Sequence, residues 1–121
     1  MLGDIGQIAI VCKDVKRAKA FYADVLKLPF LFEAPGLAFF KAGSVRLMLS
    51  GAESKEFERC SSVLYFNVTG LEAEHAALKE RGAKFRDAPH LVHQDANGAL
   101  WMAFFEDTEG NVAALMETKP A

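Results

Sequence analysis

The hydrophobic and polar positions of this chain run through the same order of segments twice. In residues 5–50 an alternating apolar segment, an amphipathic segment and three strand-like segments follow one another as IGQIAIVCKD, VKRAKAFYADVL, PFLFEA, LAFFKAG and SVRLMLS. Residues 61–117 repeat this order as SSVLYFNVTG, LEAEHAALKERG, AKFRDAPHLV, ALWMAFFED and NVAALMET. The pattern predicts two βαβββ modules, at about 5–50 and 61–117, joined by a linker at about 51–60. Such a duplication favours two small curved sheets that share one cavity.

Both amphipathic segments carry helix signals at their ends. Apolar residues recur at helical spacing in the first segment, at Val15, Ala18, Phe21, Tyr22, Val25 and Leu26. Asp14 precedes this stripe, and we expect it to cap the helix. In the second segment Thr69 and Glu72 have the spacing of a capping box, and Gly82 is expected to end the helix.

The strand predictions rest on alternation and on aromatic or β-branched content. In the first strand Ile8, Ile10 and Cys12 share one parity, while Gln7 begins the other. We expect one of these faces to pack beneath the helix and the other to line the cavity.

The second module is longer than the first around residues 89–98. Asp95, Asn97 and Gly98 are typical turn residues there and indicate a long hairpin. A second turn, at 107–111, joins the last two strands, and Gly110 is expected to supply its positive φ.

Composition excludes several classes of function. A chain of 121 residues with 51% hydrophobic residues can bury the core of one domain. Its net charge of −2, with both signs interleaved, argues against a nucleic-acid partner. No apolar run is long enough for a bilayer, and no signal pattern precedes the first strand, so we expect a cytoplasmic protein without a membrane partner. Cys12 and Cys60 lack metal-type spacing and are expected to be reduced and structural.

Two short motifs stand near opposite ends of the doubled pattern. They read Lys13-Asp14-Val15, Ala18-Lys19-Ala20-Phe21-Tyr22 and Val25-Leu26 near the start, and Ala103-Phe104-Phe105-Glu106-Asp107 with Gly110-Asn111 near the end. In these residues the sequence resembles the vicinal oxygen chelate superfamily, which includes glyoxalase I, extradiol dioxygenases, fosfomycin-resistance enzymes and bleomycin-resistance proteins. The resemblance implies an α+β fold, a single domain over 1–121 in which tandem βαβββ modules form a curved, barrel-like sheet of eight strands around a cavity. Helices would lie outside, and a homodimer is expected.

The resemblance also implies a divalent metal held by side chains of the first and fourth strands of each module. Matching the motifs residue by residue places these positions at Gln7, Leu47, Val63 and Ala114. Only Gln7 has a donor of the kind that such an ion needs, because the other three side chains are aliphatic. We therefore expect no metal or other cofactor. Gln7 would instead hydrogen-bond to backbone, water or a ligand.

The same matching turns a largely apolar set toward the cavity and predicts the ligand-binding residues. These are Gln7, Phe30, Phe32, Leu37, Phe39, Leu47, Val63, Tyr65, Met102, Phe104 and Ala114. Such a lining suits a flat or hydrophobic organic molecule.

Four further polar residues are weighed as site candidates. His90 and His93 lie near the long hairpin, and on a regular strand their spacing puts them on opposite faces. Roles at the rim or in a turn are therefore favoured over those of a metal ligand or a general base. Arg46 and Glu117 belong to the last strands of their modules, and we expect both to face solvent, with pairing to each other or to a ligand as the alternative.

These features favour metal-free binding of a small apolar or aromatic molecule in the inter-module cavity. The alternative is an enzyme of the same superfamily, of lyase, isomerase or dioxygenase type. It would use either a relocated metal at Gln7 and a hairpin histidine or acid/base chemistry at the rim. A third possibility is a structural dimer whose own side chains fill the cavity.

Overall fold

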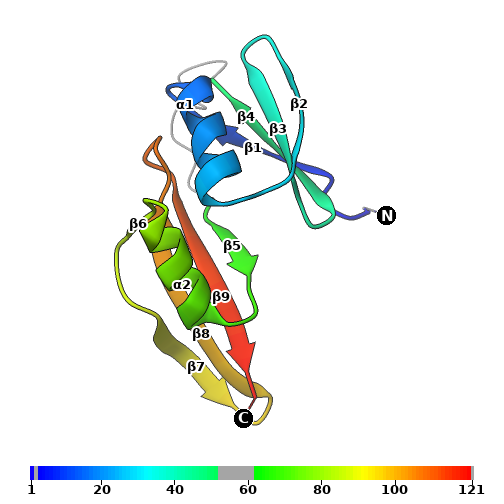
Figure 1. The fold of residues 1–121 in the computed structure, drawn as a ribbon. Coiled ribbons are helices and arrows are strands. Elements are labelled where there is room, and N and C mark those ends of the chain that lie inside the picture. The colour runs from blue at the N-terminus through cyan, green and yellow to red at the C-terminus, as the bar shows by residue number, and fades with distance from the viewer. Residues whose placement is uncertain (2, 52–61, 121) are drawn as a thin grey trace. The chain divides into compact units, whose positions relative to one another are not determined.

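The computed structural model describes residues 1, 3–51 and 62–120 (Figure 1). Backbone contacts divide the chain into two compact units, unit 1 at Met1–Ser61 and unit 2 at Ser62–Ala121. Each unit holds one repeat of the doubled segment pattern, whereas the single domain over 1–121 stays a prediction. The predicted linker, except for its first residue, lies outside the described residues, and so does Cys60.

Unit 1 contains one helical segment and a sheet of four strands. Its elements are β1 (Gln7–Val11), α1 (Val15–Ala20), η1 (Phe21–Val25), β2 (Phe30–Ala34), β3 (Leu37–Ala42) and β4 (Val45–Ser50). The strand order is β1-β4-β3-β2, with β1 and β4 parallel and the other pairs antiparallel. Asp14 accepts a hydrogen bond from the backbone N–H of Arg17 at 3.1 Å, which confirms it as the cap of α1. The predicted helix then continues as the π-helical turn η1.

The helix covers one face of the unit 1 sheet. Tyr22, in η1, packs its ring 6.1 Å from that of Phe40, which is fully buried. Phe40 pairs with Leu47 across β3 and β4, so both side chains lie on this helix-covered face. Leu49 and Ile10 share its parity and are buried as well. The core of unit 1 therefore lies between the helix and this face.

Unit 2 repeats the order of elements with one interruption. Its elements are β5 (Leu64–Asn67), α2 (Leu71–Glu80), β6 (Lys84–Phe85), β7 (His90–Asp95), β8 (Gly98–Glu106) and β9 (Val112–Lys119). The order is β5-β9-β8-β6, and β7 also pairs with β8. Figure 1 shows α2 along β8 and β9. Phe105 is fully buried. Its ring contacts that of Phe85, which in turn contacts His75 of α2, so Phe105 lies on the helix-covered face.

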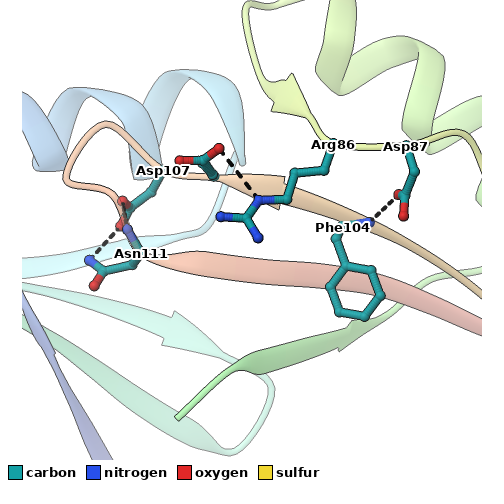
Figure 2. Close-up of polar contacts among 6 residues, drawn as sticks. Arg86, Asp87, Phe104, Asp107 and Asn111 are labelled. Atoms are coloured by element: carbon teal, nitrogen blue, oxygen red, sulfur yellow. Dashed lines mark hydrogen bonds and ion pairs between the residues drawn. The ribbon is translucent and has the colours of Figure 1, made fainter. Parts of the chain in front are cut away.

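The described strands number nine, not the expected eight, because the second strand of module two is broken. Both pieces, β6 and β7, pair with β8. At the break the backbone N–H of Arg86 still donates to the carbonyl of Phe104. The return bond goes from the Phe104 N–H to Oδ1 of Asp87, at 3.0 Å (Figure 2). A side chain thus replaces a backbone acceptor where the ladder is interrupted.

The α+β class is confirmed, with two small helical segments and mixed sheets of four and five strands. The expected closure of the sheet into a barrel is not confirmed. Within the described residues each sheet is open, with β1 and β2 at the edges of one sheet and β5 at an edge of the other. A cavity shared by the modules stays a prediction.

The N-terminus of α2 is capped differently from the prediction. The N-cap is Gly70, with φ 83°, and its neighbour Thr69 makes no cap. Glu117 of β9 supplies the acceptors instead, because its carboxylate accepts from the N–H groups of Gly70 at 2.8 Å and Leu71 at 2.9 Å. These two bonds hold the pKa of Glu117 below its usual value. Gly82, with φ 104°, ends the helix as predicted.

Both turns of unit 2 agree with the sequence. In the hairpin between β7 and β8, Asp95 accepts from the N–H of Asn97 at 2.8 Å, and Gly98 has φ 143°. In the turn before β9, Asp107 accepts from the N–H of Asn111 at 2.8 Å and from its side-chain amide at 2.9 Å (Figure 2). Gly110 has the predicted positive φ, 83°.

Two expectations about chain class can be compared with the described residues. None of their helices is long and apolar enough to cross a membrane. Cys12 is buried, and its thiol donates to the carbonyl of Ile10 at 3.4 Å. Its structural role stays a prediction.

Candidate functional site

The candidate site begins on the helix-free face of unit 1, meaning the sheet face opposite α1 and η1. Gln7 pairs with Arg46 across β1 and β4. Both side chains lie on the face of the sheet opposite to that of Leu47. Met48 shares that parity and pairs with Phe39 of β3, which pairs in turn with Phe32 of β2. Strand alternation therefore gathers these five side chains on one face.

A hydrogen-bonded arginine stacked over two phenylalanine rings forms the centre of this face. The Nε–H of Arg46 donates to Oε1 of Gln7 at 2.8 Å, and the Gln7 amide contacts the Met48 sulfur at 3.7 Å. The guanidinium carbon lies 5.2 Å from the ring centroid of Phe39 and 6.0 Å from that of Phe32. The two rings are stacked, with centroids 4.3 Å apart and an interplanar angle of 21°. Phe39 is 7% exposed and Phe32 45%, so one ring supports the other from below.

Two residues predicted for the ligand-binding face lie on the opposite face. Leu47, 1% exposed, pairs with Phe40 and belongs to the core beneath the helix. Phe30 also pairs with Phe40, and the rings make an edge contact with centroids 5.5 Å apart. The register of β2 shifts between Phe30 and Phe32, and this bulge places the two on different faces. Leu37 and Phe39 lie on the helix-free face.

Unit 2 has a comparable helix-free face. Tyr65 pairs with Ala114, and Ala114 pairs with Phe104 across β9 and β8, on the parity opposite to Phe105. The rings of Tyr65 and Phe104 make an edge contact with centroids 5.9 Å apart. Met102 lies on the same face, so the structure brings these four residues together. Val63 precedes β5 at the same parity and is half-buried.

His90 belongs to this helix-free face of unit 2. It pairs with Met102, and its ring is stacked against that of Phe104 with centroids 6.3 Å apart. Its Nδ1 lies 3.0 Å from the carbonyl of Ala88 and 3.6 Å from the Asp87 carboxylate. An imidazole held this way donates from Nδ1 and leaves Nε2 as a proton acceptor.

The expectation that His90 and His93 face opposite sides is wrong. A register shift between Leu91 and His93 leaves the two histidines opposite Met102 and Leu100, which share a face. His93 nevertheless contacts a residue of its own hairpin, because its Nε2 lies 3.0 Å from the Asp95 carboxylate. The N–H of Asn97 and this imidazole lower the pKa of Asp95.

Comparison with known proteins decides the family. The model of the Glyoxalase/Bleomycin resistance protein/Dioxygenase superfamily matches residues 4–115. The chain belongs to this superfamily. A glyoxylase-like domain-containing protein from Didymella fabae is 29% identical over 137 aligned positions, covering 98% of this chain and 95% of that protein.

Solved structures of the superfamily share the fold. TnmS3, an antibiotic binding protein from Streptomyces sp. CB03234, has a TM-score of 0.78 and 23% identity, and covers 98% of both chains. Lactoylglutathione lyase from Agrobacterium tumefaciens has a TM-score of 0.75 and 19% identity, over 97% of this chain and 95% of that one. One of these proteins is described as a binder and the other as an enzyme, so the likeness establishes the fold and leaves the activity open.

The strand pairing revises one of the four metal positions inferred for the superfamily. Ala9 and Tyr65 each lie six residues before the first residue of their helix, Val15 and Leu71. Ala9 pairs with Met48, whereas Tyr65 pairs with Ala114, so the counterpart of Ala114 in unit 1 is Met48 and not Leu47.

The resulting set of Gln7, Met48, Val63 and Ala114 does not fit a divalent ion. Two members have no donor atom, and a thioether is a poor ligand for such an ion. The Gln7 oxygen already accepts from Arg46 at 2.8 Å, and a metal there would meet the positive charge of the guanidinium. Among the residues that the structure describes, no three His, Cys, Asp or Glu side chains form a metal-binding group elsewhere.

Sequence reasoning assigned Arg46 to solvent and left it out of the ligand-binding set. Its side chain is exposed as expected, but it contacts three residues of that set: Gln7, Phe32 and Phe39. An arginine between apolar residues of a predicted strand was the available signal. Glu117, also expected to face solvent, is half-buried and caps α2.

Proposed function

We propose that this protein binds a small aromatic molecule on the helix-free face of unit 1, without a metal. The observation that carries the proposal is the stacked pair of Phe32 and Phe39 beside Arg46. Phe32 keeps 45% of its surface exposed although its partner ring is buried. A fixed, exposed aromatic surface next to polar groups is typical of a ligand-binding surface, because covering it with another ring releases water and adds stacking.

Phe32→Ala tests this role because Phe32 contributes exposed ring surface and little core. We expect the variant to bind an aromatic probe such as naphthamide at least about fivefold more weakly than the wild type, since an aromatic pair contributes roughly 0.5–1.5 kcal/mol beyond area burial. The measurement is a thermal-shift titration, in which a ligand of the folded state raises the melting temperature.

The matched control is Leu91→Ala, which removes a side chain of similar exposure, 46%, from β7. Its affinity for naphthamide should stay within about twofold of the wild type. Equal weakening in both variants would contradict a specific role of Phe32. If a broad panel of aromatic compounds leaves the wild-type melting temperature unchanged, the binding proposal is wrong.

A second candidate function, acid/base catalysis, is favoured by the surroundings of His90. The carbonyl of Ala88 and the carboxylate of Asp87 both lie near Nδ1, while Phe104 supports the ring. This arrangement would present Nε2 as a general base toward a molecule bound beside Phe104 and Tyr65. Asp87 is itself fixed, because its other oxygen accepts from the Phe104 N–H at 3.0 Å.

The acid/base proposal requires one tautomer of His90. We expect neutral His90 to carry its proton on Nδ1, as read from long-range nitrogen–proton correlations in NMR spectra recorded at alkaline pH. Asp87→Asn, which keeps the shape but removes the charge, should leave this tautomer in place, because the carbonyl of Ala88 still accepts from Nδ1. A proton on Nε2 in the wild type would remove the proposed base.

A further inference from the structure

The helix-free face of unit 1 carries positive charge without a described acidic partner. Arg46 and Lys41 lie directly opposite each other across β3 and β4 on this face. The other residues of that parity in the four strands are neutral: Gln7, Ala9, Val11, Phe32, Ala34, Leu37, Phe39, Met48 and Ser50. Glu33, at the opposite parity of β2, pairs with Lys19 instead. Like charges opposite each other destabilise a sheet, so this pair of cations costs stability unless an anion joins it.

Arg46 is positioned to receive that anion. Gln7 accepts from its Nε–H at 2.8 Å, and its guanidinium carbon lies over the ring of Phe39, 5.2 Å from the centroid. Both contacts fix the orientation of the guanidinium group, whose N–H donors form a planar fork. Because both partners are neutral, they leave the charge of Arg46 uncompensated. Within the described part of the chain, no carboxylate lies at ion-pair distance from Arg46. The N–H groups at the end of the fork have the geometry that a carboxylate accepts in bidentate form.

We propose that the ligand is an aromatic carboxylate whose ring stacks on Phe32 and whose carboxylate binds Arg46. This inference rests on the proposed function and specifies the chemical class of its ligand. The guanidinium carbon lies 6.0 Å from the Phe32 centroid, so one small molecule spans the ring and the charge. Gln7 acts as a positioning residue, because it orients Arg46. The cation that binds ligand oxygens at this site is the guanidinium, and no metal ion is needed.

The test compares naphthoate with naphthamide, which have the same ring system and differ in charge. Wild-type protein is expected to bind naphthoate about tenfold more tightly than naphthamide, as expected for a charge-assisted hydrogen bond at an exposed site. Arg46→Met, which keeps much of the length of the side chain, should reduce this ratio to about one. Raising the salt concentration should also lower the ratio in the wild type.

Two variants complete the design. Arg46→Lys keeps the charge without the fork and should retain a preference smaller than that of the wild type, which keeps the test open if Arg46→Met does not fold. Arg86→Met removes an exposed arginine that pairs with Glu106 at 3.4 Å in unit 2, and should keep the full tenfold ratio. Equal affinity of both probes for the wild type overturns the role of Arg46 but leaves aromatic binding intact. Failure of both probes to bind overturns the proposed function as well.

Discussion

Replacing Phe40 by alanine is expected to lower the free energy of unfolding by about 3–5 kcal/mol. Phe40 is fully buried between the unit 1 sheet and its helix. Its ring contacts those of Tyr22 at 6.1 Å and Phe30 at 5.5 Å, so alanine would leave a cavity lined by aromatic side chains. This cost is a large fraction of the 5–15 kcal/mol that stabilises a typical domain. Urea unfolding followed by circular dichroism measures it.

Phe32→Ala is the control because it removes the same side chain from the other face of the same sheet. With 45% of Phe32 exposed, this variant should lose only about 1 kcal/mol. The comparison tests the assignment of the two faces directly. Losses of equal size in the two variants would contradict it.

Gly98→Ala is the second substitution with a large expected effect, about 3 kcal/mol or more. Gly98 has φ 143°, which side chains rarely adopt, and an added Cβ would lie 2.5 Å from the carbonyl oxygen of Lys119. Because that oxygen belongs to the backbone of β9, relief of the clash requires the neighbouring strands to separate. Thermal unfolding should show a lower melting temperature for this variant than for any single surface substitution.

Gly110→Ala separates backbone strain from the clash. Gly110 has φ 83°, but no atom lies within 4 Å of an added Cβ. This variant should lose only the cost of a left-handed alanine, about 1–2 kcal/mol. A loss of stability in Gly98→Ala no larger than that in Gly110→Ala would contradict the close approach of β8 to β9 at Gly98.

Local signals in the sequence predicted most element boundaries. The cap at Asp14, the end of α2 at Gly82 and the turn at Gly110 all depend on residues close in the chain. The start of α2 could not be predicted in this way. Its cap comes from Glu117, 46 and 47 residues along the chain from the N–H groups it accepts from, and only strand pairing brings them together.

Face assignments were less predictable because a shift of one residue reverses them. In β4 the apolar residues Leu47, Met48 and Leu49 are consecutive, so alternation does not identify the buried parity. The bulges after Phe30 and before His93 each reverse an assignment, and the residues at the two shifts, Leu31 and Val92, are neither glycine nor proline. In unit 2, β8 and β9 pair without interruption from Ala99 to Glu106, and Tyr65, Met102, Phe104 and Ala114 share one face. That this face binds a ligand stays a prediction.

The candidate site shows the same division between residue type and placement. The sequence predicts an aromatic surface and aliphatic side chains at three of the four expected metal positions, and the absence of a metal stays a prediction. It could not show that Gln7 holds Arg46, because that contact joins residues 39 positions apart. The sequence therefore predicts a largely apolar surface, whereas the structure shows an aromatic surface beside the positioned cation of Arg46.

The central claim is that this face binds an aromatic molecule without a metal. Isothermal titration calorimetry of EDTA-treated protein with naphthoate tests this claim most directly. The titration is repeated after addition of one equivalent of Zn²⁺ or Ni²⁺. We predict binding to the metal-depleted protein with an affinity that the added ions change by less than about twofold. Binding that appears only with stoichiometric metal, and that Gln7→Ala abolishes together with metal uptake, would contradict the account.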